Sequence, residues 1–174
     1  MALTSKNISP IRMRLKGFSL FLRRWLPVVL WAAFVLFAST GVGSGDNTAS
    51  FLRPILAWIH PDLASTSFPV INYFIRKTAH VIQFAIYAAL LWRGLILPPP
   101  LKVGTRRVVG WIIGSAVFLA FLSEGIQLLS PPRTPLFTDV ALDTAGAIAG
   151  CALILGIRRL LKRPLRGAGT AGHG

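Results

Sequence analysis

The sequence contains very few acidic side chains and only one cysteine. Just 5 of its 174 residues are aspartate or glutamate, against 19 lysines and arginines, so the formal net charge is +14. Because Cys151 has no second cysteine to pair with, the chain can form neither an internal disulfide nor a cysteine-based metal cluster. Charged residues make up 14% of the chain and hydrophobic residues 53%, a balance that is rare in soluble domains. The composition therefore predicts a membrane protein.

The basic excess does not indicate a nucleic-acid partner. The sequence has no nucleic-acid recognition motif and no basic–aromatic sheet pattern, and its basic residues flank apolar segments instead. We therefore expect membrane lipids, and no nucleic acid, as partners.

Four apolar segments are each close to the roughly 20 residues that a helix needs to cross a bilayer. Backbone groups in lipid must form hydrogen bonds within their own segment, which favours helices. The expected fold is an all-α integral membrane protein with four transmembrane helices, over about residues 21–40, 76–97, 108–129 and 138–157. They form one transmembrane domain over residues 21–160, between a basic leader (1–20) and a tail (161–174) that is basic and then flexible.

The first connection is long, and the placement of basic residues predicts its side of the membrane. It includes SFLRPILAWIHPDL, an apolar stretch that is too short to cross and is interrupted by Pro54 and Pro61. This predicts a short helix in the outer interface, with a re-entrant segment as the alternative. Fifteen lysines and arginines would lie on one side of a four-span protein and four on the other. The positive-inside rule then places both termini in the cytoplasm.

The second predicted helix carries polar groups at its outer end. Arg76, Lys77 and His80 lie near its start. At about 100° per residue, Arg76, His80, Gln83 and Tyr87 fall in one stripe about 60° wide, with Lys77 off it. An ionised group in mid-bilayer costs roughly 2.5–3.5 kcal/mol, which favours a polar environment within the protein for this stripe.

The third and fourth predicted helices carry carboxylates at the same outer end. Glu124 and Gln127, three residues apart, share a face of the third helix, and Asp139 and Asp143 share a face of the fourth. Arg133 lies in the outer turn between these helices. We expect these groups to face the RKTAH motif around a wet pocket that opens to the outside.

Small residues indicate where helices approach one another. GAIAG, from Gly146 to Gly150, lies on the same stripe as the two aspartates and matches a pattern that lets a second helix approach closely. GWIIG, from Gly110 to Gly114, is a weaker case. A glycine face could also pair two copies, so a homo-oligomer stays open.

The chemistry of these residue types suits a phosphate-bearing lipid. Arginine binds phosphate through two parallel hydrogen bonds and lysine as a point charge. Histidine serves as a general base or nucleophile, with carboxylates as its partners. The candidate catalytic residues are His80, Glu124, Asp139 and Asp143, and the candidate substrate-binding residues are Arg76, Lys77, Gln83, Tyr87, Gln127 and Arg133.

Other interpretations of the same residues stay open. The cluster could be a structural ion-pair network that holds the helices together, and Asp139 alone could cap its helix. No cofactor is evident, although His80 and the three carboxylates could hold a divalent cation through oxygen-rich ligands.

These residues resemble the VanZ-like family. RKTAHVIQFAIYAALL and FLSEGIQLLSPPRTPLFTDVALDTAGAIAG are similar in order and spacing to its R-K-x-x-H opening, E-x-x-Q helix end, P-x-R turn and D-V-x-x-N/D-T-x-G-A segment. The resemblance covers about Phe74–Gly150. This chain departs from many members in having Gln83-Phe84 where they have Glu-Tyr, and Asp143 where they have Asn.

The resemblance implies a small multi-span protein of the bacterial cytoplasmic membrane. The founding member of the family is associated with resistance to the glycopeptide teicoplanin. The expected function is the modification of a lipid head group or of a lipid-linked cell-wall precursor, with an effect on glycopeptide susceptibility. The alternative is non-catalytic binding of an anionic lipid or a glycopeptide-like ligand.

Overall fold

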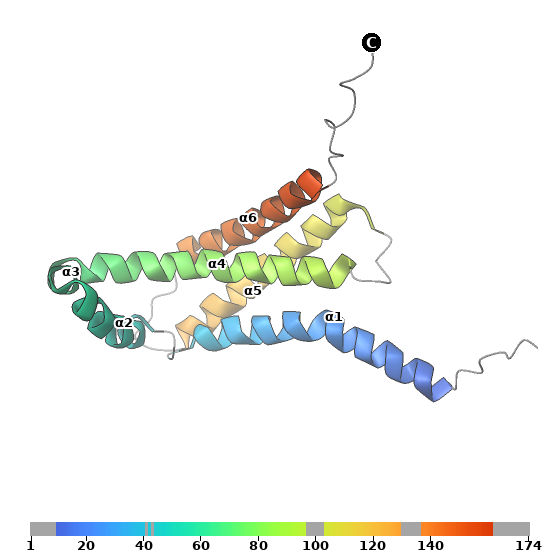
Figure 1. The fold of residues 1–174 in the computed structure, drawn as a ribbon, viewed down its shortest axis with the longest axis horizontal. Coiled ribbons are helices and arrows are strands. Elements are labelled where there is room, and N and C mark those ends of the chain that lie inside the picture. Colours follow the sequence, from blue (N-terminus) through green and yellow to red (C-terminus); the bar gives the residue numbers. More distant parts are fainter. Residues whose placement is uncertain (1–9, 41, 43, 97–102, 130–136, 162–174) are drawn as a thin grey trace, which may run out of the picture.

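The computed structural model describes residues 10–40, 42, 44–96, 103–129 and 137–161, and its regular elements are all helices. Four of them are long and apolar enough to cross a membrane, which confirms the predicted all-α fold with four spans. Figure 1 shows these four helices side by side, with two shorter helices folded against one end. In chain order the helices are α1 (Pro10–Ala38), α2 (Gly45–Ile59), α3 (Pro61–Thr66), α4 (Phe68–Ile96), α5 (Thr105–Leu128) and α6 (Phe137–Leu161).

The helix ends differ most from the predicted spans at the start of α4. This helix begins at Phe68 rather than at Arg76, because the apolar residues before the RKTAH motif continue the same helix. Pro69 is tolerated in the first turn, where its missing N–H has no helical acceptor. Arg76 therefore lies about 12 Å along the helix from its start, at 1.5 Å per residue.

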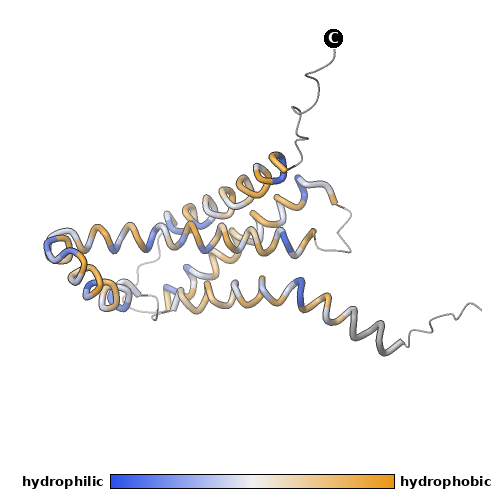
Figure 2. Tube along the Cα trace, in the orientation of Figure 1, coloured by the Kyte–Doolittle hydropathy of each residue, from blue (hydrophilic) through white to orange (hydrophobic). Residues whose placement is uncertain are grey.

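Helix α4 is the central element of the bundle and contacts each of the other five helices. Its fully buried Ala88 and nearly buried Phe84 belong to a core that also includes Ile112 of α5 and Ala147 of α6. Large hydrophobic residues such as Phe118 point outward, as expected for helices that face lipid. Figure 2 shows hydrophobic residues along the length of all four long helices.

The short helix α2 occupies the connection for which the sequence predicts an interfacial helix. None of its residues is buried. Phe51, Ile55, Trp58 and Ile59 are exposed and recur at the spacing of one helical face. This unpartnered apolar face suits a helix that lies in the membrane interface, and the interfacial position itself remains a prediction.

Charges are segregated between the two ends of the bundle. All five carboxylates of the chain lie at the end formed by α2, α3, the starts of α4 and α6, and the end of α5, which we call the acidic end: Asp46, Asp62, Glu124, Asp139 and Asp143. The opposite end, which we call the basic end, carries Arg23, Arg24, Arg93, Arg106, Arg107, Arg158 and Arg159. The positive-inside rule predicts that the basic end faces the cytoplasm.

Candidate functional site

Two glycines of α6 allow α4 to pack directly against it. A Cβ built on Gly146 would lie 2.9 Å from Val81 Cα, and a Cβ built on Gly150 would lie 2.7 Å from the carbonyl oxygen of Ala85. Any larger residue would therefore clash with the backbone of α4. This confirms the close helix approach predicted for GAIAG. Within the described part of the chain no helix approaches GWIIG in this way, because a Cβ on Gly110 or Gly114 would meet no described atom within 4 Å.

The close packing brings two pairs of polar residues together across α4 and α6. Lys77 donates a hydrogen bond to Asp139, and one turn further along His80 Nδ1 lies 2.9 Å from Asp143 Oδ1. Asp143 is 0% exposed, and His80 is the only residue that hydrogen-bonds its carboxylate among those described. A buried carboxylate with a single histidine partner fixes the orientation of the imidazole ring.

The Asp143 contact also selects the tautomer of His80. A carboxylate accepts hydrogen bonds, so Nδ1 carries the proton when it binds Asp143 Oδ1. The other ring nitrogen, Nε2, is then free to accept a proton. The His80 side chain is 19% exposed, and it lines a cavity rather than the core.

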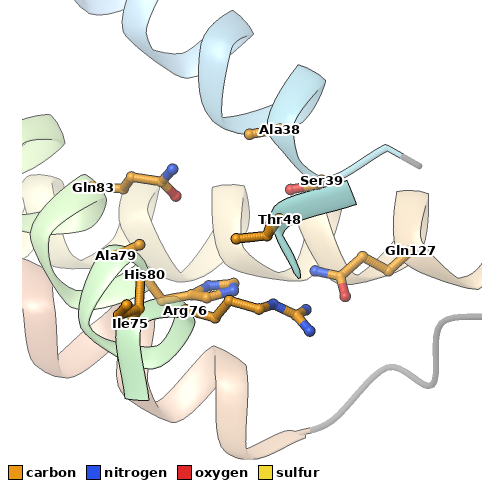
Figure 3. Close-up of a pocket in the computed structure, with 9 residues that line it drawn as sticks. All are labelled: Ala38, Ser39, Thr48, Ile75, Arg76, Ala79, His80, Gln83 and Gln127. Carbon is orange, nitrogen blue, oxygen red and sulfur yellow. The ribbon is translucent and has the colours of Figure 1, made fainter. Parts of the chain in front are cut away.

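This cavity has a volume of about 160 Å³ and lies at the acidic end. In Figure 3 the His80 ring lies beside the Arg76 side chain, and the Arg76 guanidinium extends toward the Gln127 amide of α5. Ser39 and Thr48 line it from the opposite side, and their hydroxyls donate to the backbone carbonyl oxygens of Val35 and Ser44. The described residues that line it are Ala38, Ser39, Thr48, Ile75, Arg76, Ala79, His80, Gln83 and Gln127.

Arg76 is the cation that faces this cavity. It forms no ion pair with any carboxylate in the described part of the chain. Its guanidinium lies against the start of α2, where a Cβ on Gly45 would be 2.7 Å from Arg76 Nη1. Asn72 Nδ2 donates to the carbonyl oxygen of Gly45 over 3.4 Å and helps hold α2 over the site. The arrangement presents a positive charge to the cavity without neutralising it.

Glu124 acts on the cavity through its neighbour on α5. Both Glu124 and Gln127 are buried, and Gln127 Nε2 donates a 3.2 Å hydrogen bond to Glu124 Oε1. This contact orients the Gln127 amide, which is the group of the pair that reaches the cavity. Glu124 is therefore a positioning residue in this arrangement.

The structure brings together most of the residues that the sequence singled out. Arg76, His80, Gln83 and Gln127 line the cavity, and Lys77, Asp139, Asp143 and Glu124 support them from behind. Tyr87 does not belong to the site, because it is buried in the apolar core beside Phe84, one turn deeper than Gln83. Arg133 lies outside the described residues.

Three lining or covering residues were missed by the sequence reasoning. Ser39 follows the last residue of α1, Gly45 begins α2, and Thr48 lies in the first turn of α2. The stretch from Ser39 to Thr48 is rich in small polar residues and glycines, which signals a loop but not its position over the RKTAH motif. Among the described residues, no three His, Cys, Asp or Glu side chains are grouped to hold a metal ion.

The comparison with protein families agrees with this geometry. The VanZ/LLP1 family model matches residues 24–161, which is most of the chain and includes every described site residue. The chain belongs to the VanZ/LLP1 family. No curated protein and no solved structure matches it. Family membership confirms the resemblance found in the RKTAH motif and in the segments that carry Glu124, Asp139 and Asp143.

Proposed function

We propose that this VanZ-like membrane protein modifies the phosphate-bearing head group of a membrane lipid or of a lipid-linked cell-wall precursor. The observation that carries the proposal is the position of His80 between buried Asp143 and a cavity that Arg76 also lines. Arg76 would bind the phosphate, since a guanidinium without a carboxylate partner matches an oxyanion in charge and geometry.

His80 would act as the general base. With its Nδ1 proton held by Asp143, Nε2 can accept the proton of an attacking water or hydroxyl and return it to the leaving oxygen. A positioned base of this kind contributes typically 10²–10⁴-fold to a rate. The amide of Gln127 would orient the head group around it, with Ser39 and Thr48 lining the opposite side.

The position of the site also supports a lipid substrate. The cavity lies at one end of the membrane-spanning helices, beneath a helix whose exposed apolar face includes Phe51 and Trp58. A head group at the level of the lipid phosphates could reach His80 while its chains stay in the bilayer. If the head group belongs to a wall precursor, its modification would alter susceptibility to glycopeptides such as teicoplanin.

A second candidate function is a non-catalytic one. The Lys77–Asp139 and His80–Asp143 pairs both link α4 to α6, and such pairs would also occur in a cluster that binds an anionic ligand or only stabilises the bundle. The two functions differ in their response to a substitution that removes the proton acceptor of His80 and keeps its hydrogen bond to Asp143.

Comparing cells that express wild type with cells that express His80→Gln at matched levels tests the proposal. Glutamine can still donate a hydrogen bond to Asp143 Oδ1, but it cannot accept a proton as His80 Nε2 does. We expect mass spectrometry of lipids and lipid-linked precursors to show one phosphate-bearing species that changes only with wild type. Identical profiles from two folded, equally abundant proteins would favour the non-catalytic function.

A further inference from the structure

A second cavity lies at the basic end, far from the His80 site. Its volume is about 270 Å³, which exceeds the 160 Å³ of the acidic-end cavity. A water molecule takes up about 30 Å³ of liquid, so the space exceeds what a single bound water would fill. Trp92 of α4, Thr105 of α5 and Arg158 of α6 bring polar groups to its wall.

The polar groups of this cavity are mainly hydrogen-bond donors. Arginine and the tryptophan indole donate and cannot accept. Trp92 is 4% exposed, and its Nε1–H is buried without an acceptor among the described residues. An unmade hydrogen bond of this kind is destabilising, so a ligand that accepts a hydrogen bond from Trp92 Nε1 would remove that cost. These hydrogen-bond donors suit an anion as the ligand.

Arg158 adds a positive charge that no carboxylate neutralises. Its guanidinium lies 5.5 Å from the centre of the Trp92 ring, which places it over the same wall. All five side-chain carboxylates of the chain lie at the acidic end. Asp143, which is on the same helix as Arg158, is separated from it by 15 residues, or about 22 Å at 1.5 Å per residue. The counterion for Arg158 must therefore come from outside the described chain.

The start of α5 contributes to the same wall. Its N-cap residue is Gly104, which has no side chain to accept from the first N–H groups of the helix. Thr105 follows it and lines the cavity. A helix start of this kind favours a bound anion through its free N–H groups and its dipole. The N–H groups at the start of α5 add to the hydrogen-bond donors of Trp92 and Arg158.

We propose that the basic-end cavity binds a phosphate group, that of an anionic membrane lipid. Apolar side chains from Leu95, Ile96 and Val108 lie beside the donors, which suits a head group that continues into acyl chains. Basic pockets between membrane helices bind anionic lipid head groups in this way. The site is distinct from the His80 cavity and does not depend on the proposed catalysis.

Native mass spectrometry of the purified full-length protein tests the site. The protein would be titrated with phosphatidylglycerol, with diacylglycerol of the same chains, and with inorganic phosphate. We expect phosphatidylglycerol to bind and diacylglycerol not to bind. Arg158→Gln should weaken phosphatidylglycerol binding by about 10–100-fold, the usual range for a charged hydrogen bond. Trp92→Phe keeps the ring and removes only the N–H, and should weaken binding by about 3–10-fold.

Arg159→Gln is the matched control, because it removes the same charge from the neighbouring exposed position. We expect it to bind as wild type. Equal losses in Arg158→Gln and Arg159→Gln, or wild-type binding by Arg158→Gln, would overturn the proposal. Arg158-dependent binding of inorganic phosphate without the lipid would overturn the lipid assignment and leave a soluble phosphate as the ligand.

Discussion

Replacing His80 with glutamine is expected to reduce the rate of lipid modification by about 10²–10⁴-fold, the contribution typical of a positioned general base. Glutamine is similar in length, and its amide can still donate to Asp143 Oδ1, so the buried carboxylate keeps a partner. The variant cannot accept a proton as Nε2 does. The rate would be measured for the lipid or precursor species that responds to wild type, per amount of folded protein.

His60→Gln provides the control for this variant. His60 lies at the end of α2, is exposed, and does not line the cavity. We expect this variant to react at the wild-type rate. A rate for His80→Gln within a few-fold of wild type, from protein that melts like wild type, would show that His80 does not act as the base.

Replacing Gly146 with alanine is expected to disrupt the contact between α4 and α6. The added Cβ would lie 2.9 Å from Val81 Cα, and a backbone atom cannot move away unless the whole helix moves. Overpacking of this kind typically costs about 1–3 kcal/mol. Because the same contact sets the His80–Asp143 hydrogen bond, activity should fall together with thermal stability in detergent.

Gly114→Ala is the matched substitution on α5. A Cβ at Gly114 would meet nothing within 4 Å, and alanine is favoured over glycine in a helix by roughly 0.5–1 kcal/mol. We expect this variant to melt at or slightly above the wild-type temperature. If Gly146→Ala and Gly114→Ala had equal stability, the close approach of α4 and α6 would not hold the bundle together.

The transmembrane fold could be predicted from the sequence because lipid leaves a chain few alternatives. Four apolar segments of sufficient length must form helices, and the structure contains all four. Their ends were harder to place, since an apolar run can continue a helix beyond a charged residue. The eight residues from Phe68 to Ile75 extend α4 in this way and put Arg76 within the helix.

Helical periodicity predicted which residues of the candidate site share a helix face. The stripe that holds Asp139, Asp143 and Gly146 does face α4, because the glycines allow the closest packing there. Periodicity predicts the face of a helix on which a residue lies, but not whether that position is at the cavity or deeper in the bundle. Tyr87 therefore shares the stripe of His80 and yet lies in the core. The pairing of Lys77 with Asp139 depends on the register of two helices, which a single sequence does not contain.

The parts of the site that come from connections could not be predicted. Thr48 reaches the cavity only because α2 folds back over α4, and a flexible-looking loop does not specify that path. The basic-end cavity was also missed. The positive-inside rule already accounts for arginines at the cytoplasmic ends of helices. The sequence therefore gave no reason to single out Arg158.

The most direct test of the central claim uses purified wild-type protein in bilayers made from the lipid extract of the expressing cells. Mass spectrometry would follow all phosphate-bearing species over time, with His80→Gln as the reference that lacks the general base. The account predicts that wild type converts one species at its head group and that His80→Gln converts it about 10²–10⁴-fold more slowly. No conversion by folded wild type, or the same conversion by both proteins, would contradict the assignment of catalysis to the cavity between Arg76 and His80.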